Sequence, residues 1–163
     1  MQKALIIGRF QPFHKGHEFL INQVLKQNYS IIIAIGSSQE SRTAKNPFNY
    51  EERKKMIQSC FKNAKIMPSQ DYESDEDWAD DLMSKAKFDI VYSNNEKVNE
   101  IFYKRKIQVK KVNELPNISG TKIRKMINNN DNKYKELIPK SCLEEMEKIC
   151  AMKIIKECFK IKK

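Results

Sequence analysis

Short apolar runs along the chain alternate with longer stretches whose apolar residues recur at helical spacing. The run 4–7 ends at Gly8, and Ser30–Ile35 is β-branched and apolar throughout. Both runs are typical of strands that are covered on their two faces. Between them, residues 14–27 place their apolar side chains along one side of a helix. The chain therefore begins with a predicted strand–helix–strand unit.

The same alternation continues to about residue 112. Further strands are predicted over 64–67, 88–92 and 107–112. Further helices are predicted over 51–61, 77–85 and 96–103. Strands that alternate with helices imply parallel strands joined by crossover helices. We therefore predict an α/β fold, a Rossmann-like open parallel sheet of about five strands with helices on both faces.

The C-terminal third has a different pattern. Residues 113–117 form a predicted loop, 121–127 a helix and 128–132 a polar break. Pro139 opens a final helix, which we expect to pack on the sheet, with a partner site as the alternative. The apolar stripe of that helix is Leu143, Met146, Ile149, Cys150 and Ile154. At 163 residues the chain suits one domain, 1–163, with a βα core over 1–112 and a loop with C-terminal helices over 113–163.

Composition and charge exclude several classes of protein. No apolar run is long enough for a transmembrane helix, and the N-terminus does not resemble a signal peptide, so we expect a soluble, cytoplasmic protein. The four cysteines include no CxxC pair, which argues against a zinc ribbon or a redox dithiol. The net charge of +10 favours polyanionic partners, but its lysines are scattered, which is more typical of a solvated surface.

The loop after the first strand carries both histidines of the chain. In open parallel sheets, ligands bind beyond the carboxyl ends of the strands, where this loop lies. Arg9 precedes the His14-x-Gly16-His17 pattern at the start of a predicted helix, whose N-terminal N–H groups favour a phosphate. The imidazoles could donate to phosphate oxygens, and Gly16 would permit close approach. Local capping or packing by the histidines is the alternative.

A second cluster, Ile118-Ser119-Gly120-Thr121-Lys122-Ile123-Arg124, opens another predicted helix. Its hydroxyl and guanidinium groups could hold a polyphosphate. Alternatively, Ser119 or Thr121 simply caps the helix.

These two clusters resemble the motifs (H/T)xGH and ISSTxxR of the nucleotidyltransferase superfamily, although Gly120 stands where the wider superfamily usually has Ser. The full run GRFQPFHKGH is similar to the archaeal-type nicotinamide mononucleotide adenylyltransferases. The middle of the chain extends this resemblance through Ser37-Ser38-Gln39, Asn46-Pro47-Phe48, Glu52-Arg53, Asp77-Trp78 and Tyr92-Ser93-Asn94-Asn95.

The resemblance implies a role for each matching position. The residues that it implies for ATP binding are Gly8, Arg9, Phe10, His14, Gly16, His17, Ser119, Thr121 and Arg124. Of these, Arg9, His14, His17 and Arg124 would act in catalysis. The residues that it implies for the mononucleotide are Ser37, Gln39, Asn46, Phe48, Arg53, Trp78, Asn94 and Asn95. Arg53 would contact the mononucleotide phosphate, and Trp78 would stack on the nicotinamide ring, although a core position would also explain this Trp.

The implied reaction joins ATP and nicotinamide mononucleotide to give NAD and pyrophosphate by direct in-line transfer. Because a phosphomonoester is largely a dianion at pH 7, the acceptor needs no general base. Mg²⁺ carried by ATP is expected, without a dedicated metal site in the protein. Nicotinate mononucleotide, FMN, phosphopantetheine or a cytidylyl-accepting alcohol phosphate are alternative acceptors. A non-catalytic nucleotide- or nucleic-acid-binding protein is the alternative of a different class, and a homo-oligomer stays open.

Overall fold

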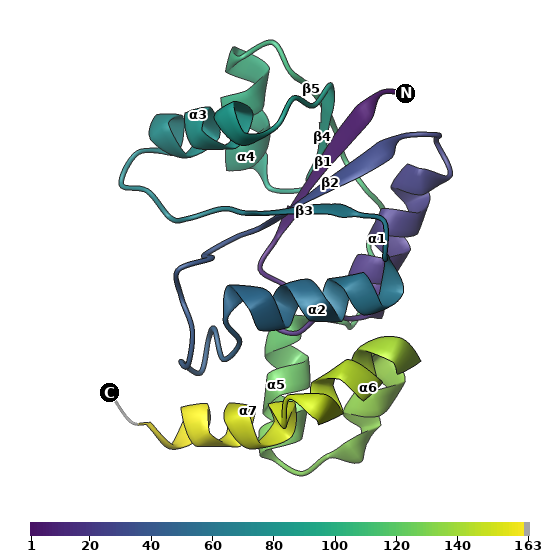
Figure 1. The fold of residues 1–163 in the computed structure, drawn as a ribbon, viewed down its shortest axis with the longest axis vertical. Helices are drawn as coiled ribbons and strands as arrows, with labels where there is room; N and C mark the ends of the chain where they lie inside the picture. The colour runs from purple at the N-terminus through teal and green to yellow at the C-terminus, as the bar shows by residue number, and fades with distance from the viewer. Residues whose placement is uncertain (162–163) are drawn as a thin grey trace. The chain divides into compact units, whose positions relative to one another are not determined.

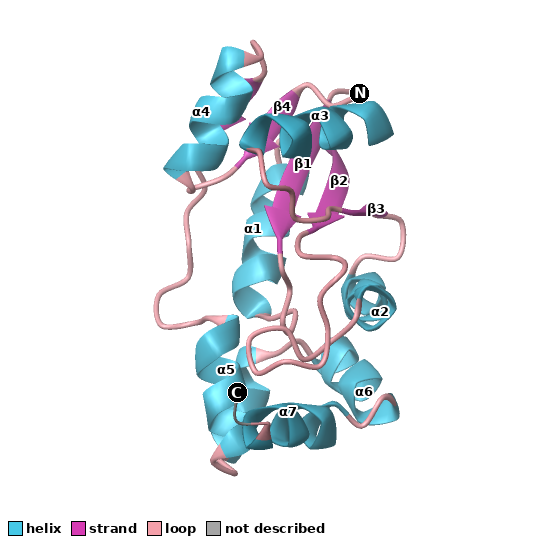
Figure 2. Cartoon of the chain, turned by 90° about the vertical axis from the view of Figure 1, so that its left-hand side faces the viewer, coloured by secondary structure: helices cyan, strands magenta, loops and turns pink. Residues whose placement is uncertain are grey.

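The computed structural model describes residues 1–161, drawn in Figures 1 and 2. The strands are β1 (Lys3–Gly8), β2 (Ser30–Ile35), β3 (Lys65–Pro68), β4 (Ile90–Tyr92) and β5 (Gln108–Lys110). The helices of the first two thirds are α1 (Lys15–Leu25), α2 (Tyr50–Cys60), α3 (Asp75–Lys85) and α4 (Glu96–Lys104). Those that follow are α5 (Gly120–Asn128), the 3₁₀ helix η1 (Asn132–Leu137), α6 (Lys140–Lys148) and α7 (Ala151–Lys160).

The five strands form one parallel sheet in the order β3-β2-β1-β4-β5. β1 is central and pairs over its whole length with β2, from Lys3 opposite Ser30 to Gly8 opposite Ile35. The α/β fold and the five strands of the prediction are confirmed. The strand order reverses direction at β1, and this is the position where open sheets of this kind usually bind ligands.

Helices cover both faces of the sheet, which is why its strands are apolar on both sides. Leu5, Ile32 and Val91 lie on one face and are buried with Leu82 of α3 and Phe102 of α4 in a single hydrophobic cluster. On the opposite face, Tyr92 donates its hydroxyl hydrogen to the side-chain oxygen of Gln27, just beyond α1, at 2.9 Å. Ile21 and Val24 of α1 are also completely buried.

The chain divides into two compact units, and each combines segments that are distant in sequence. Unit 1 comprises residues 1–8, 20–38 and 64–114 and contains the sheet with α3 and α4. Unit 2 comprises residues 9–19, 39–63 and 115–163. Within unit 2, α6 packs on α2 and α7 packs on α5. The division into a core over 1–112 and a C-terminal part over 113–163 stays a prediction.

The C-terminal region corrects one expectation. The single helix predicted from Pro139 onward is two helices, α6 and α7, separated at Cys150, which has a left-handed backbone with φ of 56°. This break changes the buried face: Cys142 and Met146 are buried on α6, and Ala151, Ile155 and Cys158 on α7, whereas Cys150 is exposed. Helical periodicity could not reveal the break, because the apolar spacing continues across it.

No helix in the described part of the chain is long and apolar enough to cross a membrane. The four cysteines are all free thiols. Burial raises the pKa of the Cys142 thiol, whose Sγ lies 3.8 Å from the carbonyl oxygen of Phe13. This thiol is therefore protonated and unreactive at neutral pH.

Candidate active site

His14 and His17 form a stacked pair at the start of α1. Their ring centroids are 3.6 Å apart and the rings are nearly parallel, with an interplanar angle of 19°. The backbone N–H of His14 donates to Nδ1 of His17 at 3.3 Å, and the N–H of His17 donates to Nδ1 of His14 at 3.4 Å. Because each Nδ1 accepts a hydrogen bond, the proton of each neutral ring is on Nε2. The pair therefore offers two N–H donors of defined orientation.

Both histidines are neutral at physiological pH. Burial lowers the pKa of His14 to about 4, and burial together with the neighbouring His14 lowers the pKa of His17 well below its usual value. Gly16 keeps the pair in place: a methyl group on its Cα would lie 3.0 Å from Cε1 and Nδ1 of His14. The predicted close approach of a phosphate at Gly16 stays a prediction; what the structure shows is that a larger residue here would press on the imidazole of His14.

Two phenylalanines support this pair. Phe10 and Phe13 are buried, and their rings lie 4.6 Å and 5.5 Å from the ring of His17. Phe10 has a left-handed backbone with φ of 52°, a conformation that costs a non-glycine residue on the order of 1 kcal/mol or more. Packing against His17 compensates for this strain and fixes the turn that follows β1.

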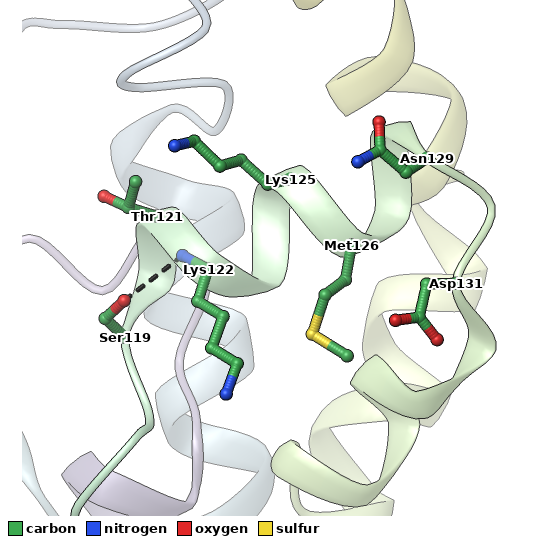
Figure 3. Close-up of a pocket in the computed structure, with 7 residues that line it drawn as sticks. All are labelled: Ser119, Thr121, Lys122, Lys125, Met126, Asn129 and Asp131. Atoms are coloured by element: carbon green, nitrogen blue, oxygen red, sulfur yellow. Dashed lines mark hydrogen bonds between the residues drawn. The ribbon is translucent and has the colours of Figure 1, made fainter.

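The start of α5 carries the second predicted cluster. Ser119 is the N-cap, and its hydroxyl oxygen accepts from the N–H of Lys122 at 3.1 Å (Figure 3). The capping alternative for Ser119 is thus correct, while its O–H remains a donor. Thr121 is exposed one residue inside the helix. Together they border a cavity of about 440 Å³ along α5, whose other lining residues are Lys122, Lys125, Met126, Asn129 and Asp131.

Arg124 is the buried cation of this region, with only 6% of its surface exposed. Its Nε donates to the carbonyl oxygen of Ala44 at 2.9 Å, Nη1 to that of Gln11 at 2.7 Å, and Nη2 to Oγ1 of Thr121 at 3.3 Å. Within residues 1–161, no carboxylate forms an ion pair with it. Burial, and then the positive charge of Arg9, lower the pKa of Arg124. The positive charge of Arg9 thus disfavours the charged form of Arg124.

The segment between β2 and α2 is fixed by its own polar contacts. Arg42 binds both carboxylate oxygens of Glu52, at 2.7 Å and 2.6 Å, and donates to the carbonyl oxygen of Pro47 at 2.8 Å. Glu52 also forms a capping box with Asn49, the N-cap of α2. Burial alone would raise the pKa of Glu52, but the hydrogen bonds from Arg42 and Asn49 lower it. The loop is therefore held on a rigid helix start.

Three predicted mononucleotide residues lie in this part of unit 2. Phe48 and Asn46 are buried, and Oδ1 of Asn46 accepts no hydrogen bond among the described residues. Arg53 is fully buried, and its guanidinium donates to the carbonyl oxygens of Asn49 at 3.2 Å and Arg9 at 3.0 Å. Arg53 thus supports the loop that carries Arg9, and its predicted contact with a substrate phosphate stays a prediction.

Unit 1 holds a second cavity, of about 190 Å³, that is lined by Trp78 and Asn95 together with Asp71, Tyr72, Asp75, Lys97, Val98 and Ile101. The indole N–H of Trp78 donates to Oγ of Ser69 at 2.9 Å, and its ring packs edge-on against Phe102. The indole is therefore fixed in the cavity wall. Lys97 pairs with Asp75 at 2.9 Å.

The remaining predicted site residues differ in their surroundings. Ser37 donates to Oδ1 of Asp71 at 3.1 Å, which places it beside this cavity. Asn94 is used internally: its amide bonds Val112 at both backbone groups and Glu114. Gln39, in unit 2, is exposed. Gly8 ends β1 opposite Ile35.

The structure also reveals residues that the sequence did not indicate. The side chain of Gln11 forms hydrogen bonds with both backbone groups of Phe48. The carbonyl oxygen of Ala44 accepts from Nε of Arg124. Gln11 lies within the run GRFQPFHKGH, but the resemblance implies no role for it, so only the folded contacts single it out. Within residues 1–161, no group of three His, Cys, Asp or Glu side chains is arranged to hold a metal ion.

This chain is similar to several known proteins. The profile of the cytidylyltransferase-like family matches residues 5–126. A nicotinamide-nucleotide adenylyltransferase from Thermoplasma acidophilum is 42% identical over 138 residues, which cover 77% of this chain and 75% of that protein. One of the same name from Methanococcus aeolicus is 38% identical over 90% of this chain and 89% of its own length.

A solved structure shows the same fold. It is a bifunctional NMN adenylyltransferase/ADP ribose pyrophosphatase from Francisella tularensis, complexed with AMP and a manganese ion. The similarity has a TM-score of 0.78 at 26% identity and covers 96% of this chain. The chain spans about half the length of that protein, 51%.

Proposed function

Because this chain belongs to the cytidylyltransferase-like family, and within it to the nicotinamide-nucleotide adenylyltransferases, we propose that it joins ATP and nicotinamide mononucleotide to give NAD and pyrophosphate. It is a nucleotidyltransferase, and its reaction belongs to NAD biosynthesis. The sequence resemblance and the fold agree on this activity.

The observation that carries the proposal is Arg124, a buried guanidinium that forms no ion pair with any carboxylate of residues 1–161. A buried charge without a counter-ion is costly, so proteins retain one mainly where a ligand supplies the opposite charge. Three of the five N–H donors of the guanidinium are used by the protein, which leaves two for phosphate oxygens. Arg9 adds a second positive charge, and the start of α5 adds N–H groups.

This arrangement suits phosphoryl chemistry that needs no nucleophilic side chain. An oxygen of the mononucleotide phosphate forms a bond to the α-phosphorus of ATP, while the bond from that phosphorus to the bridging oxygen of pyrophosphate breaks. Both reactants are anions, so the protein has to offset their repulsion and the charge that develops on pyrophosphate. We assign this task to Arg9, His14, His17 and Arg124, with Ser119 and Thr121 on the β- and γ-phosphates.

For the mononucleotide, we assign the pyridine ring to the cavity of Trp78. A pyridinium ring stacked on an indole is favoured by cation–π attraction of about 1 kcal/mol. Ser37 and Asn95 belong to the same cavity or its margin, which supports the assignment. Gln39, Asn46, Phe48, Arg53 and Asn94 stay predicted contacts of the mononucleotide.

A divalent cation, which we propose to be Mg²⁺, would enter with the nucleotide. The described residues offer no three-ligand cluster for it, and we therefore assign no step of the reaction to a protein-bound metal. We also propose that the protein acts in the cytoplasm, and that it can associate with further copies of itself.

The proposal is tested by measuring pyrophosphate release from ATP and Mg²⁺ with separate acceptors: nicotinamide mononucleotide, nicotinate mononucleotide, FMN and phosphopantetheine. We expect release with nicotinamide mononucleotide, accompanied by an equal amount of NAD. The variant His17→Ala, purified identically, controls for a contaminating enzyme, since it should lose most of the release.

Release with FMN or phosphopantetheine alone would keep the nucleotidyl transfer and contradict the proposed acceptor. Absence of release with every acceptor, from a folded protein, would contradict the proposal itself. Titration with nucleic acid at several salt concentrations would then test the binding-protein alternative.

A further inference from the structure

Gln11 joins two loops of unit 2 through its side chain. It is almost completely buried, with 3% of its surface exposed. Its Nε2 donates to the carbonyl oxygen of Phe48 at 2.8 Å, and its Oε1 accepts from the N–H of Phe48 at 3.0 Å. The side-chain amide therefore satisfies both backbone groups of Phe48, as a neighbouring β-strand would. These two hydrogen bonds fix loop 9–14 relative to the segment before α2.

The backbone of the same residue holds Arg124. The carbonyl oxygen of Gln11 accepts from Nη1 of Arg124 at 2.7 Å, while Nε of Arg124 reaches Ala44, which lies in the other loop. The two carbonyl oxygens that orient the guanidinium thus come from the two segments that the Gln11 side chain connects. There is little free space around this carbonyl oxygen, because a methyl group on Gly120 would lie only 2.8 Å from it.

We propose that Gln11 is a positioning residue of the phosphate site: its side-chain amide fixes the two loop carbonyls that aim the guanidinium of Arg124 at the polyphosphate. The inference rests on the phosphate site of the proposed function and assigns Gln11 no contact with substrate. A small displacement of such a group is costly, since misplacing a catalytic group by about 1 Å can lower the rate about a hundredfold.

The test uses Gln11→Met, which keeps the length and volume of the side chain and removes both hydrogen bonds to Phe48. The first readout is the affinity for inorganic triphosphate, measured by calorimetry, which requires no assumption about the acceptor. We expect Gln11→Met to weaken this affinity about tenfold, the equivalent of one or two net hydrogen bonds. In the transfer assay, kcat should fall and the KM for ATP should rise, with the KM for the mononucleotide nearly unchanged.

A purely structural role would lower stability without these effects. The matched control is Leu82→Ala in the hydrophobic cluster of unit 1, which should destabilise the protein and leave the triphosphate affinity at the wild-type value. All proteins are compared at a temperature well below their unfolding transitions. If Gln11→Met binds triphosphate as tightly as Leu82→Ala does, the inference is wrong.

A double-mutant cycle with Arg124→Ala identifies the route of the effect. If Gln11 acts through Arg124, Gln11→Met should weaken triphosphate binding far less in the Arg124→Ala background than in the wild type. Equal, additive losses would overturn the inference. If Gln11→Met does not fold, Gln11→Glu serves instead at pH 8: it keeps the acceptor for the Phe48 N–H, lacks the donor to the carbonyl, and should show the same coupling.

The result is distinguishable from a failure of the proposed function. A protein that binds triphosphate with this coupling but forms no NAD would contradict the proposed acceptor and retain the role of Gln11. A wild-type protein that binds neither triphosphate nor ATP would overturn both.

Discussion

The two compact units bury different kinds of side chain. Both have apolar interiors, but among the described residues five of the six buried polar or charged side chains, namely Gln11, His14, Asn46, Arg53 and Arg124, belong to unit 2. Unit 1 contributes only Ser69. Hydrophobic burial suffices to define a parallel sheet, whereas aiming cations and imidazoles at a ligand requires buried hydrogen bonds.

The contrast implies that the two units should respond to mutation in different ways. Truncation in unit 1 should cost stability, because its interior depends on apolar packing. Truncation of the buried polar groups of unit 2 should cost activity first if, as we propose, these groups hold the geometry of a ligand site. The predictions below test this separation.

Arg124 should give the largest effect. We expect Arg124→Ala to lower kcat/KM for ATP by a factor of about 10² to 10³, as removal of a preorganised charge donor typically does. Arg124→Lys keeps the charge but not the fork that bonds Ala44 and Gln11, so a loss of about tenfold or more should remain. Steady-state kinetics check both, with thermal unfolding as the control for folding. Wild-type activity in Arg124→Lys would show that charge alone suffices.

Leu82 in unit 1 should give the opposite outcome. Leu82 is completely buried in the cluster with α4 and the sheet, so Leu82→Ala should lower the free energy of unfolding by about 2–5 kcal/mol. At a temperature where the variant is fully folded, its kcat should be close to that of the wild type. Urea unfolding and the transfer assay measure the two quantities. A hundredfold loss of kcat at full folding would contradict the separation of the two units.

The difference between apolar packing in unit 1 and buried polar contacts in unit 2 also explains which parts of the fold the sequence predicts. The runs 4–7 and Ser30–Ile35 identify β1 and β2, because a strand buried on both faces must be apolar throughout. The helix–strand alternation then predicts the parallel sheet. The left-handed break at Cys150 leaves no such pattern, and the single predicted helix was therefore wrong.

The candidate site was predictable only where chemistry and spacing coincide. The pair His14 and His17 stands out, because two imidazoles at the start of a helix suit phosphate. Gln11 carries no such signal, since its role depends on a contact with Phe48, 37 positions away in sequence. Arg53 is a third case: its predicted phosphate contact came from a resemblance and stays a prediction, and the structure adds that its guanidinium donates to the carbonyl oxygens of Asn49 and Arg9.

The stacked histidines predict an acid limit to stability. Since the pKa of His14 is lowered to about 4, the unfolded chain binds a proton below about pH 6.5 that the folded protein does not. Stability should therefore be complete above pH 6.5 and fall as the pH approaches 4, by about 3 kcal/mol for His14 alone. Urea unfolding between pH 7 and pH 4 measures the slope, and His14→Gln should reduce it. If His14→Gln had the same dependence of stability on pH as the wild type, His14 would not be neutral in the folded protein.

Gly120 provides the smallest test, a single methyl group. The similar motif ISSTxxR has serine here, yet in this protein a Cβ would lie 2.8 Å from the carbonyl oxygen of Gln11 and 3.2 Å from Nη1 of Arg124. That oxygen cannot easily withdraw, because Arg124 and the Phe48 contacts of Gln11 hold it. Gly120→Ala should therefore destabilise the protein by about 1–3 kcal/mol and raise the KM for ATP.

The matched control is Gly16→Ala, which also adds a methyl group near the start of a helix. The nearest atoms to its new Cβ would be side-chain atoms, namely Cε1 and Nδ1 of His14 at 3.0 Å and Cγ2 of Ile118 at 3.7 Å. A side-chain ring yields more readily than a backbone carbonyl, and alanine improves helix propensity by up to about 1 kcal/mol, so the cost in stability should be smaller. Thermal unfolding and the KM for ATP compare the two variants. If Gly120→Ala matched the wild type in both, the Gln11 carbonyl would be free to move, and the buried polar contacts of unit 2 would not fix the position of Arg124.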